Sequence, residues 1–366
     1  MDESSCEAPE RASTQHLSIL WAGLNAHSQL QTDPTTDVRS FAHLSVATGQ
    51  HDDLDILFAG WSSTVLRSRE KVWSLGYQNL ASTIEASPRS AFGDHDGLIG
   101  FLDDDGGLVL VVNAAQNPES SAMSLATKTT DSSPRLSHIA LAVLEFENLV
   151  KFLAWYHDPS GEGNYPDKHH MLEGRPKQLL ANTATFLLLM EDGEVYSWGD
   201  PRYHQSLGRA TIEEDVSVPP ADEPGLVDAI GGLKIAKIAS GGCMSAALSE
   251  DSALYLWGAS NAPGAEQRIK CLRETTSDDV ALVELPGDDD SPLVVLDVAL
   301  GGAHAAVAAE HSGRNLLYVV GDNKNGQPGR GSEEGFLENW MQVEGISGVH
   351  REVCGPRSTY AFIFKP

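Results

Sequence analysis

Few residues in this sequence are spaced as catalytic or metal-binding groups are. The adjacent His169 and His170 could ligate a metal ion, but neighbouring imidazoles point in different directions and no third ligand lies nearby in sequence. We interpret the pair as part of a polar surface loop. The sequence holds no Gly-x-Ser-x-Gly motif, no phosphate-binding loop and no His-Glu-x-x-His motif. It therefore predicts a protein that is not an enzyme and that needs no cofactor.

Two runs of aspartate and the four cysteines give no stronger indication of a metal site. The runs at 103–105 and 288–290 lack the alternating ligands and the distal glutamate of a calcium loop, so we interpret them as turns. The cysteines, none of which forms a Cys-x-x-Cys pair, are Cys6, Cys243, Cys271 and Cys354. Their scatter argues against a zinc site and against a disulfide framework. We expect reduced thiols, as in a cytoplasmic and nuclear protein.

Net charge narrows the classes of partner. The chain has 366 residues, with 52 acidic and 25 basic side chains and a net charge of −27. Because so acidic a chain would repel phosphates, we expect no direct binding to DNA. No run of 18 apolar residues is present, and residues 1–14 are polar and acidic. The sequence therefore predicts no membrane association, no signal peptide and a disordered N-terminus over residues 1–14.

A short pattern recurs along the chain and indicates the elements that would position these residues. It reads aliphatic, aromatic or leucine, any residue, apolar residue, glycine, which is typical of a β-strand that ends on a turn. The five copies are residues 19–23, 72–76, 195–199, 254–258 and 317–321. A strand rich in small residues precedes four of them, at 59–66, 180–188, 239–248 and 299–307. The Asp-Gly turn within 191–194 indicates that each pair of strands is a hairpin.

The two ends of the chain each carry half of such a hairpin. Residues 353–364 match the first strand and lack the second, whereas residues 19–23 match the second and lack the first. A ring closed by its termini explains both halves. Two weaker strand pairs, at 92–112 and 136–155, raise the predicted number of units to seven. Polar stretches between the units predict loop inserts near 113–134, 157–177, 211–224 and 261–279.

The repeat resembles that of the regulator-of-chromosome-condensation family. Residues 191–208, which read Glu-Asp-Gly-Glu-Val-Tyr-Ser-Trp-Gly-Asp-Pro-Arg-Tyr-His-Gln-Ser-Leu-Gly, are similar to the family's repeat, and so are residues 321–329. The resemblance implies an all-β fold: a single seven-bladed β-propeller over residues 15–366, whose first blade is closed by the N- and C-terminal strands. The repeat strands contain Trp73, Trp155, Trp198 and Trp257, and we expect these to pack blade against blade.

The resemblance also implies a candidate site at one end of the ring. The family's repeat places histidines near the ring axis, on the face that meets a small GTPase. Only His304 keeps this position here, and the equivalent residues are Ser63, Thr185, Met244 and Ser358. A hydrogen bond between inner strands is the alternative role for His304. This likeness implies a guanine nucleotide exchange factor for a small Ran- or Rab-like GTPase.

A second likeness, in length, acidity and degenerate middle units, is to the fungal alpha-tubulin suppressor-like branch of the family. It implies a non-enzymatic scaffold that binds the small CSL-type zinc protein. Through that protein it would serve Elongator-dependent modification of the tRNA wobble uridine and the diphthamide biosynthesis machinery. We take this scaffold as the first hypothesis and the exchange factor as the alternative.

Aromatic and arginine residues of the loops are the candidates for contact with either partner, because such residues carry much of the binding energy of interfaces. The protein-binding candidates are Trp61, Arg202, Tyr203, His204, His304 and Trp340. Trp340 follows an acidic loop and could instead anchor it.

Overall fold

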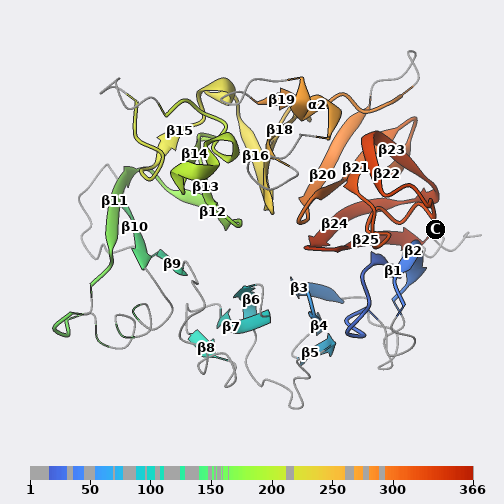
Figure 1. Ribbon diagram of the computed structural model, residues 1–366, viewed down its shortest axis with the longest axis horizontal. Helices are drawn as coiled ribbons and strands as arrows, with labels where there is room; N and C mark the ends of the chain where they lie inside the picture. The colour runs from blue at the N-terminus through green and yellow to red at the C-terminus, as the bar shows by residue number, and fades with distance from the viewer. Residues whose placement is uncertain are drawn as a thin grey trace, which may run out of the picture.

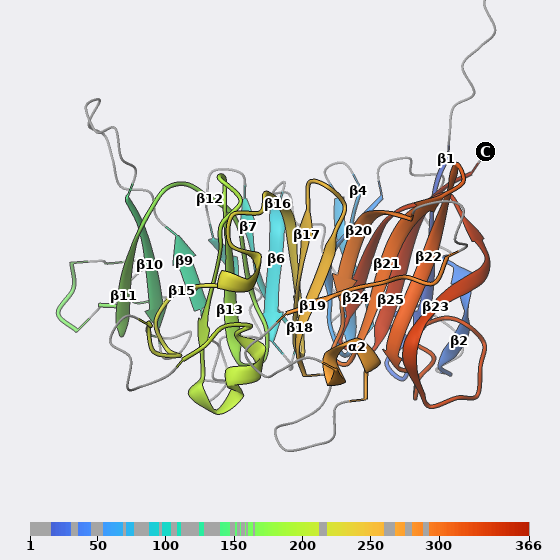
Figure 2. The same cartoon turned by 90° about the horizontal axis from the view of Figure 1, so that it is seen from above.

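The chain forms antiparallel β-sheets arranged around a central axis (Figure 1). In Figure 2 the strands of neighbouring sheets run side by side, roughly along that axis. The computed structural model describes residues 16–30, 36–44, 54–68, 71–76, 88–94, 97–103, 108–110, 124–127, 140–146, 151, 154, 158, 160–163, 165–211, 218–259, 268–274, 280–287 and 293–365. The N-terminal stretch 1–14 lies outside them. Among the described residues, no helix has the length and apolar character needed to cross a membrane.

Five of the sheets are the blades of a β-propeller, each with an inner strand next to the axis in Figure 1. Two blades hold the first part of the chain and its C-terminal end: β24 (Val349–Gly355), β25 (Ser358–Lys365), β1 (His16–Gly23), β2 (Val38–His43); and β3 (Asp55–Ala59), β4 (Ser63–Ser68), β5 (Lys71–Gly76). The other three follow each other along the chain: β12 (Pro176–Ala181), β13 (Thr185–Met190), β14 (Val195–Gly199), β15 (Gly225–Leu226); β16 (Ile235–Gly241), β17 (Cys243–Ser249), β18 (Leu254–Ala259), β19 (Ala281–Leu282); and β20 (Val294–Leu300), β21 (His304–His311), β22 (Arg314–Asp322), β23 (Phe336–Ser347). Each blade is named below by its inner strand: the β24, β3, β12, β16 and β20 blades.

A glycine at the end of the third strand marks each blade. The register pairs this glycine with a residue at the start of the second strand, as Gly23–Ser358, Gly76–Ser63, Gly199–Thr185, Gly258–Met244 and Gly321–His304. At Gly258, φ is +95° and an added Cβ atom would lie 2.2 Å from the carbonyl oxygen of Cys243. Only glycine tolerates both conditions. The repeated glycine of the sequence therefore has the same structural cause in all five blades.

The prediction of seven blades is wrong, because the structure shows five. The region of the weak repeats contributes two three-stranded sheets: β6 (Pro88–Asp94), β7 (Gly97–Asp103), β8 (Leu108–Leu110); and β9 (Ser124–Thr127), β10 (Ala140–Phe146), β11 (Lys168–Glu173). The strand-end glycine is missing there, since valines follow β8 in the sequence. The strand predicted at 149–155 is also wrong at its described positions, because Lys151 and Ala154 are helical.

The two ends of the chain pair as the half-hairpins predict. β1 lies antiparallel to β25, with a continuous register from His16–Lys365 to Gly23–Ser358. Trp21, Tyr360 and Phe362 of this blade are buried, and they pack with Leu66 of the β3 blade. Closure of the blade by the termini therefore also builds the core between two blades.

The tryptophans of the repeat pack largely as expected. Trp257 packs against Leu187 and Leu189 of the β12 blade, and Trp73 belongs to the core that joins the β3 and β24 blades. Trp198 stacks on Phe186 of its own blade, with ring centroids 5.3 Å apart, and it also packs with Leu172 on β11 of the neighbouring sheet. Trp155 lies outside the described residues.

Each inner strand has a β-bulge at the same place, which turns the following side chain toward the next blade. The register shifts lie between Ile56 and Phe58, Pro176 and Gln178, Ile235 and Lys237, Val295 and Asp297, and Val349 and Arg351. Four of these residues make polar contacts between blades. Gln178 bonds to the backbone of Ile238, Lys237 pairs with Asp297, Asp297 accepts from the backbone of Glu352, and Arg351 pairs with Asp55.

Regular elements occur within three of the stretches assigned to loop inserts. β9 lies within 113–134, β11 within 157–177, and the short helix α2 (Lys270–Arg273) within 261–279. His169 and His170 therefore lie on a strand, which corrects the loop expected there, and the His170 ring is 6.2 Å from that of Trp198. Two 3-10 helices, η2 (Pro201–Ser206) and η3 (Asp228–Ile230), complete the β12 blade and its link to the next. No cluster of three metal-ligating side chains occurs in the described part of the chain.

Candidate protein-binding face

One end of the propeller carries the loops that join the inner strand of each blade to its second strand. We call this end the loop face. Its loops contact one another through backbone: Thr183 N–H donates to the carbonyl of Gly242 at 2.9 Å, and Gly302 N–H donates to that of Pro356 at 3.1 Å. A Cβ atom at Gly242 would lie 1.9 Å from the carbonyl oxygen of Gly302. The glycines of these loops therefore allow a closely packed, continuous surface.

Trp61 stands exposed on the loop face, in the turn between β3 and β4. Its side chain is 38% exposed, whereas Trp198, Trp257 and Trp340 are buried. The guanidinium of Arg357, from the neighbouring blade, lies over the indole ring at 4.2 Å from its centroid. A cation above the face of tryptophan is attracted by the ring quadrupole. Two residues from loops almost 300 positions apart thus form one compact element.

Hydrogen bonds hold this element in position from both sides. Gln29, which is buried, donates to the backbone carbonyl of Trp61 at 3.1 Å and to that of Leu24 at 2.8 Å. Arg357 donates through Nη1 to the side-chain oxygen of Asn325 at 3.2 Å, and Asn325 donates to Asp37 at 2.7 Å. Both contacts come from the segments that follow a strand-end glycine. The repeat's polar tail therefore works here as a support for the exposed residues.

Arg202, Tyr203 and His204 lie together on η2, at the same end of the propeller. The pairing of Thr185 with Gly199 places the start of this segment beside the loop of its blade. Asp200 caps η2 by accepting from the backbone N–H of Arg202 at 2.9 Å. A side-chain hydrogen bond from Arg202 lowers the pKa of Asp200. These three candidates share a surface with one another and belong to a different blade from Trp61.

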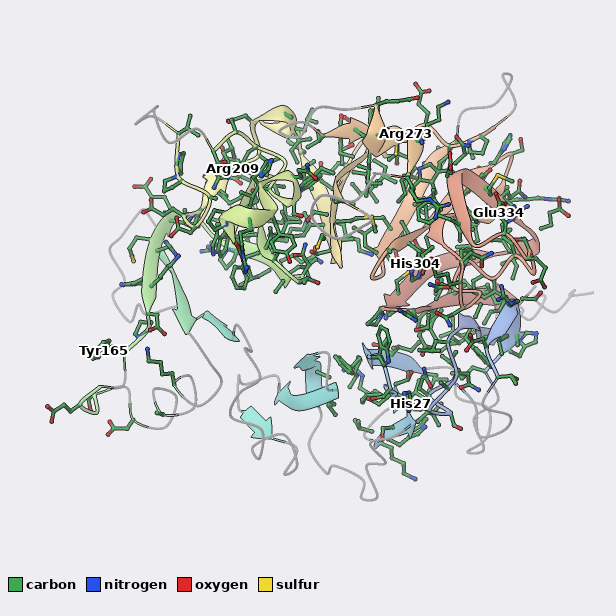
Figure 3. All side chains as sticks on the ribbon, viewed as in Figure 1. His27, Tyr165, Arg209, Arg273, His304 and Glu334 are labelled. Carbon is green, nitrogen blue, oxygen red and sulfur yellow. The ribbon has the colours of Figure 1, made fainter. Side chains whose placement is uncertain are left out.

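A buried arginine fixes the loop that follows η2. Arg209 is 3% exposed and donates to five backbone carbonyls, those of Ser197, Ala210, Pro219, Pro220 and Glu223 (Figure 3). Burial lowers the pKa of its guanidinium. Because all of its donors are used within the chain, we assign Arg209 a structural role.

His304 does not reach the surface, which corrects its expected contact with a partner. The side chain is fully buried at the start of β21, and Nε2 is 3.0 Å from the Thr359 hydroxyl on β25. Desolvation lowers the pKa of His304 to about 4. The imidazole is therefore neutral at physiological pH and joins two blades. The alternative role predicted for it, a hydrogen bond between strands near the axis, fits this geometry.

Trp340 also lies apart from the loop face. It is 6% exposed on β23, the outermost strand of its blade. The sequence interpretation missed Arg357, although a signal was present. Gly60-Trp61-Ser62-Ser63 and Gly355-Pro356-Arg357-Ser358 occupy equivalent loops, and in both the two central residues are less buried than the residues that flank them.

Known proteins share part of the sequence and the fold of this chain. No family model matches the sequence. RCC1 domain-containing protein 1 of Mus musculus is 29% identical over 224 residues, covering 52% of this chain and 56% of the relative. Its Homo sapiens counterpart is 29% identical over 226 residues, covering 52% and 57%. The chain thus matches little more than half the length of these relatives.

Solved structures of the Saccharomyces cerevisiae protein Prp20 have the same fold. One covers 97% of this chain and 93% of its own, with a TM-score of 0.57 and 16% identity. Yeast RCC1 (Prp20) in complex with Kap60 covers 100% and 97%, with a TM-score of 0.61 and 16% identity. These matches do not confirm the alpha-tubulin suppressor-like branch. The chain is therefore similar in sequence to RCC1-like repeat proteins over about half of its length, and it shares the β-propeller fold of yeast RCC1.

Proposed function

We propose that the protein is a non-enzymatic binding propeller and that a partner protein docks on its loop face, with Trp61 and Arg357 as the anchor. The observation that carries the proposal is the exposed Trp61 ring held beneath the Arg357 guanidinium. Tryptophan and arginine are enriched among residues that dominate interface energies. A pair already fixed by Gln29 and Asn325 loses little side-chain entropy on binding.

A small Ran- or Rab-like GTPase is the first partner to test. The Prp20 structure is described together with its binding properties to Gsp1p and histones, and this supports a protein-binding role for the fold. The family resemblance of the repeat implies nucleotide exchange on a small GTPase. The comparisons give no support to the CSL-type zinc protein, Elongator or the diphthamide machinery. We therefore keep that scaffold role as the second candidate.

The test is capture from cell extract in buffer with EDTA, followed by mass spectrometry. Chelation of magnesium keeps a GTPase nucleotide-free and bound to an exchange factor. We expect the wild-type protein to retain a small GTPase, which GTP and magnesium then release. The Trp61→Ala variant should retain at least tenfold less, because it removes the anchor. The matched control is Arg314→Ala, an exposed arginine in the hairpin between β21 and β22, at the opposite end of the blade.

Each result bears on a separate part of the proposal. Equal capture by wild type and Trp61→Ala would contradict the docking face. Capture of a CSL-type zinc protein, lost in Trp61→Ala, would keep the face and replace the partner. Release of labelled GDP from the purified GTPase, accelerated by wild type and not by Trp61→Ala, would establish exchange itself.

A further inference from the structure

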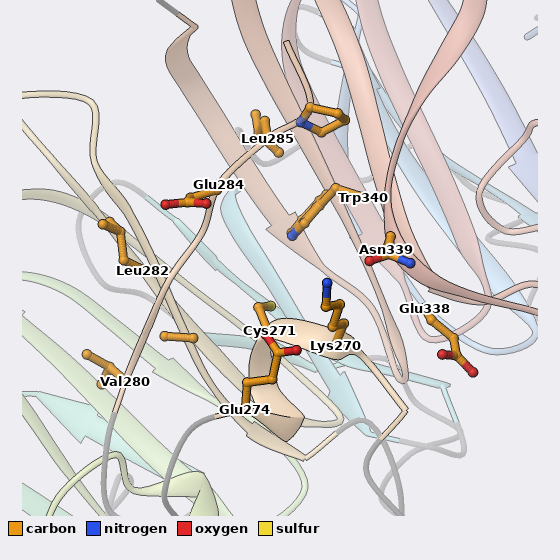
Figure 4. A pocket seen from close by; sticks show the side chains of 12 residues that line it. Lys270, Cys271, Glu274, Val280, Leu282, Glu284, Leu285, Glu338, Asn339 and Trp340 are labelled. Atoms are coloured by element: carbon orange, nitrogen blue, oxygen red, sulfur yellow. The ribbon is translucent and has the colours of Figure 1, made fainter. Parts of the chain in front are cut away.

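A cavity of about 560 Å³ lies on the outer rim of the propeller, between α2, the segment 280–286 and β23 (Figure 4). It is built by the β16 and β20 blades and does not involve Trp61 or Arg357. Trp340, Cys271 and Leu282 contribute its apolar surface, and Glu274, Glu284 and Glu338 contribute carboxylates. The cavity is therefore part apolar and part acidic.

The indole of Trp340 presents a hydrogen-bond donor to this cavity. Trp340 is only 6% exposed. Its Nε1 atom has no nitrogen or oxygen acceptor among the described residues. Figure 4 shows the indole nitrogen turned toward the space between Glu284 and Cys271. The polar group beside this nitrogen is the thiol of Cys271. Burial raises the pKa of the thiol, and a hydrogen bond with Trp340 lowers it by a smaller amount. Sulfur is a weak acceptor, so the N–H retains the capacity to donate to a ligand oxygen.

The carboxylates around the indole are not balanced by cations of the chain. Glu338 lies 3.6 Å from Arg273, and Lys270 is the remaining cation of the lining. Glu274 and Glu284 are exposed and form no ion pair in the described part of the molecule. Anionic ligands are disfavoured here. A divalent cation also fits poorly, because no three metal-ligating side chains cluster among the described residues.

We propose that this cavity binds a basic peptide segment of a partner protein. A backbone carbonyl of the peptide accepts the hydrogen bond from Trp340 Nε1, and a lysine or arginine side chain pairs with Glu274 and Glu284. The peptide thus supplies both an acceptor and a cation, which the lining requires. Leu282, 56% exposed at the edge strand β19, offers apolar contact to the chain of the peptide. The net charge of −27 brings basic partners toward the surface in general, and the cavity selects the position.

The probe is a fluorescent peptide of nine residues that alternates arginine and alanine, measured by anisotropy in about 0.15 M salt, where long-range attraction is screened. Trp340→Phe keeps the aromatic bulk and removes only the N–H. We expect it to weaken binding about fivefold, which corresponds to about 1 kcal/mol for one neutral hydrogen bond. Glu284→Gln should weaken binding about threefold, since it removes one exposed charge pair.

Matched controls separate the cavity from general charge attraction. Trp257→Phe removes another buried indole N–H that has no acceptor among the described residues, in the core beside Leu187. Glu191→Gln removes an exposed charge at a distant hairpin turn. Both should bind the peptide as wild type does. If Trp340→Phe binds as tightly as wild type while the two glutamate variants weaken binding equally, only net charge attracts the peptide and the proposal is wrong.

Cysteine alkylation gives a second readout in the unchanged protein, should Trp340→Phe fail to fold. Cys271 and Cys243 are both half-buried thiols, and only Cys271 lines the cavity. Bound peptide should slow the reaction of Cys271 with iodoacetamide at least threefold and leave the rate at Cys243 unchanged, as mass spectrometry resolves by site. Equal rates at Cys271 with and without saturating peptide would overturn the proposal.

Discussion

Two interfaces between neighbouring blades have the same backbone geometry and opposite chemistry. Between the β12 and β16 blades, which we call the neutral interface, the Gln178 side chain exchanges hydrogen bonds of 2.9 and 3.0 Å with the backbone of Ile238. Between the β20 and β24 blades, which we call the titratable interface, Asp297, Glu352 and His304 make the contacts. The bulge fixes where blades meet, and the side chains around it determine the chemistry of the contact.

The titratable interface also connects to the preceding blade. Lys237 pairs with Asp297, whose other oxygen accepts from the backbone N–H of Glu352. Asp297 is 10% exposed and Lys237 is 34% exposed at their side chains. Glu352 accepts from Ala308 N–H at 3.0 Å. One carboxylate therefore joins three blades, whereas Gln178 joins two.

Asp297→Ala should cause the largest loss of stability at the titratable interface. It leaves Lys237 without its carboxylate and the buried backbone N–H of Glu352 without its acceptor, and the two losses together cost several kcal/mol. We expect a loss of about 4 kcal/mol in the free energy of unfolding, measured by urea denaturation at pH 7. Asp251→Ala, in an exposed turn of the β16 blade, is the control and should change stability little. A loss no larger than that caused by Gln178→Ala at the neutral interface would contradict the expected difference between the two interfaces.

The second expectation concerns His304 and acid. Its pKa of about 4 in the folded protein lies below the ordinary value of 6.5, mainly because of desolvation. Between these values the unfolded chain binds a proton that the folded chain does not, so stability is retained above pH 6.5 and falls as pH decreases toward 4. The loss from this group is about 3 kcal/mol over that range.

Comparison of His304→Gln with wild type isolates this loss, because glutamine does not titrate. The pH dependence of the unfolding free energy should be shallower in the variant between pH 6.5 and 4. Parallel curves for the two proteins would contradict a buried neutral imidazole. For a variant at the neutral interface, the curve of unfolding free energy against pH should run parallel to that of wild type over the whole range.

Gln178→Ala is the corresponding change at the neutral interface. It leaves the backbone N–H and carbonyl of the buried Ile238 without partners, which costs about 2 kcal/mol. The measurement is again urea denaturation, and the loss should be the same at pH 5 and pH 8. A loss that varied with pH would mean that the interface is not neutral. Lys177→Ala, an exposed neighbour on the same strand, is the control.

The sequence predicts the part of the fold that repeats by residue type. The strand-end glycines are visible because one steric requirement recurs, and so five blades and the closure by the termini follow from them. The bulge residues Gln178, Lys237, Asp297 and Arg351 occupy one position and share no side-chain type. Because each blade has a different residue type at this position, the position produces no repeated pattern in the sequence. The two weak strand pairs raise the predicted number of blades to seven, because apolar runs without the glycine resemble strands of any sheet.

The sequence predicts only the part of the candidate site that belongs to the repeat. Trp61 was identifiable as an aromatic residue in a glycine loop, and the structure places it on the surface. Arg357 became a partner only through a contact between blades that are adjacent because the ring closes. His304 matched a repeat position, but its burial depends on packing against Gly301 and Thr359, which the motif does not encode.

The smallest expected effect concerns Glu352, whose contribution to stability changes with pH in the direction opposite to that of His304. Desolvation first, and then the charge of Asp297, raise the pKa of Glu352 above its ordinary value of 4.5. The folded chain therefore holds a proton that the unfolded chain releases, and this contribution to stability falls as pH rises above 4.5. Glu352→Gln keeps an oxygen for Ala308 N–H and removes the titration. It should be more stable than wild type at pH 8 and equal to it at pH 4, by urea denaturation. Below pH 6.5 the contribution of His304 to stability changes with pH in the other direction. The two pH-dependent contributions therefore partly cancel in wild type, and only the single variants reveal them. A Glu352→Gln protein less stable than wild type at pH 8 would mean that the ionised carboxylate, rather than the acid, holds the titratable interface together.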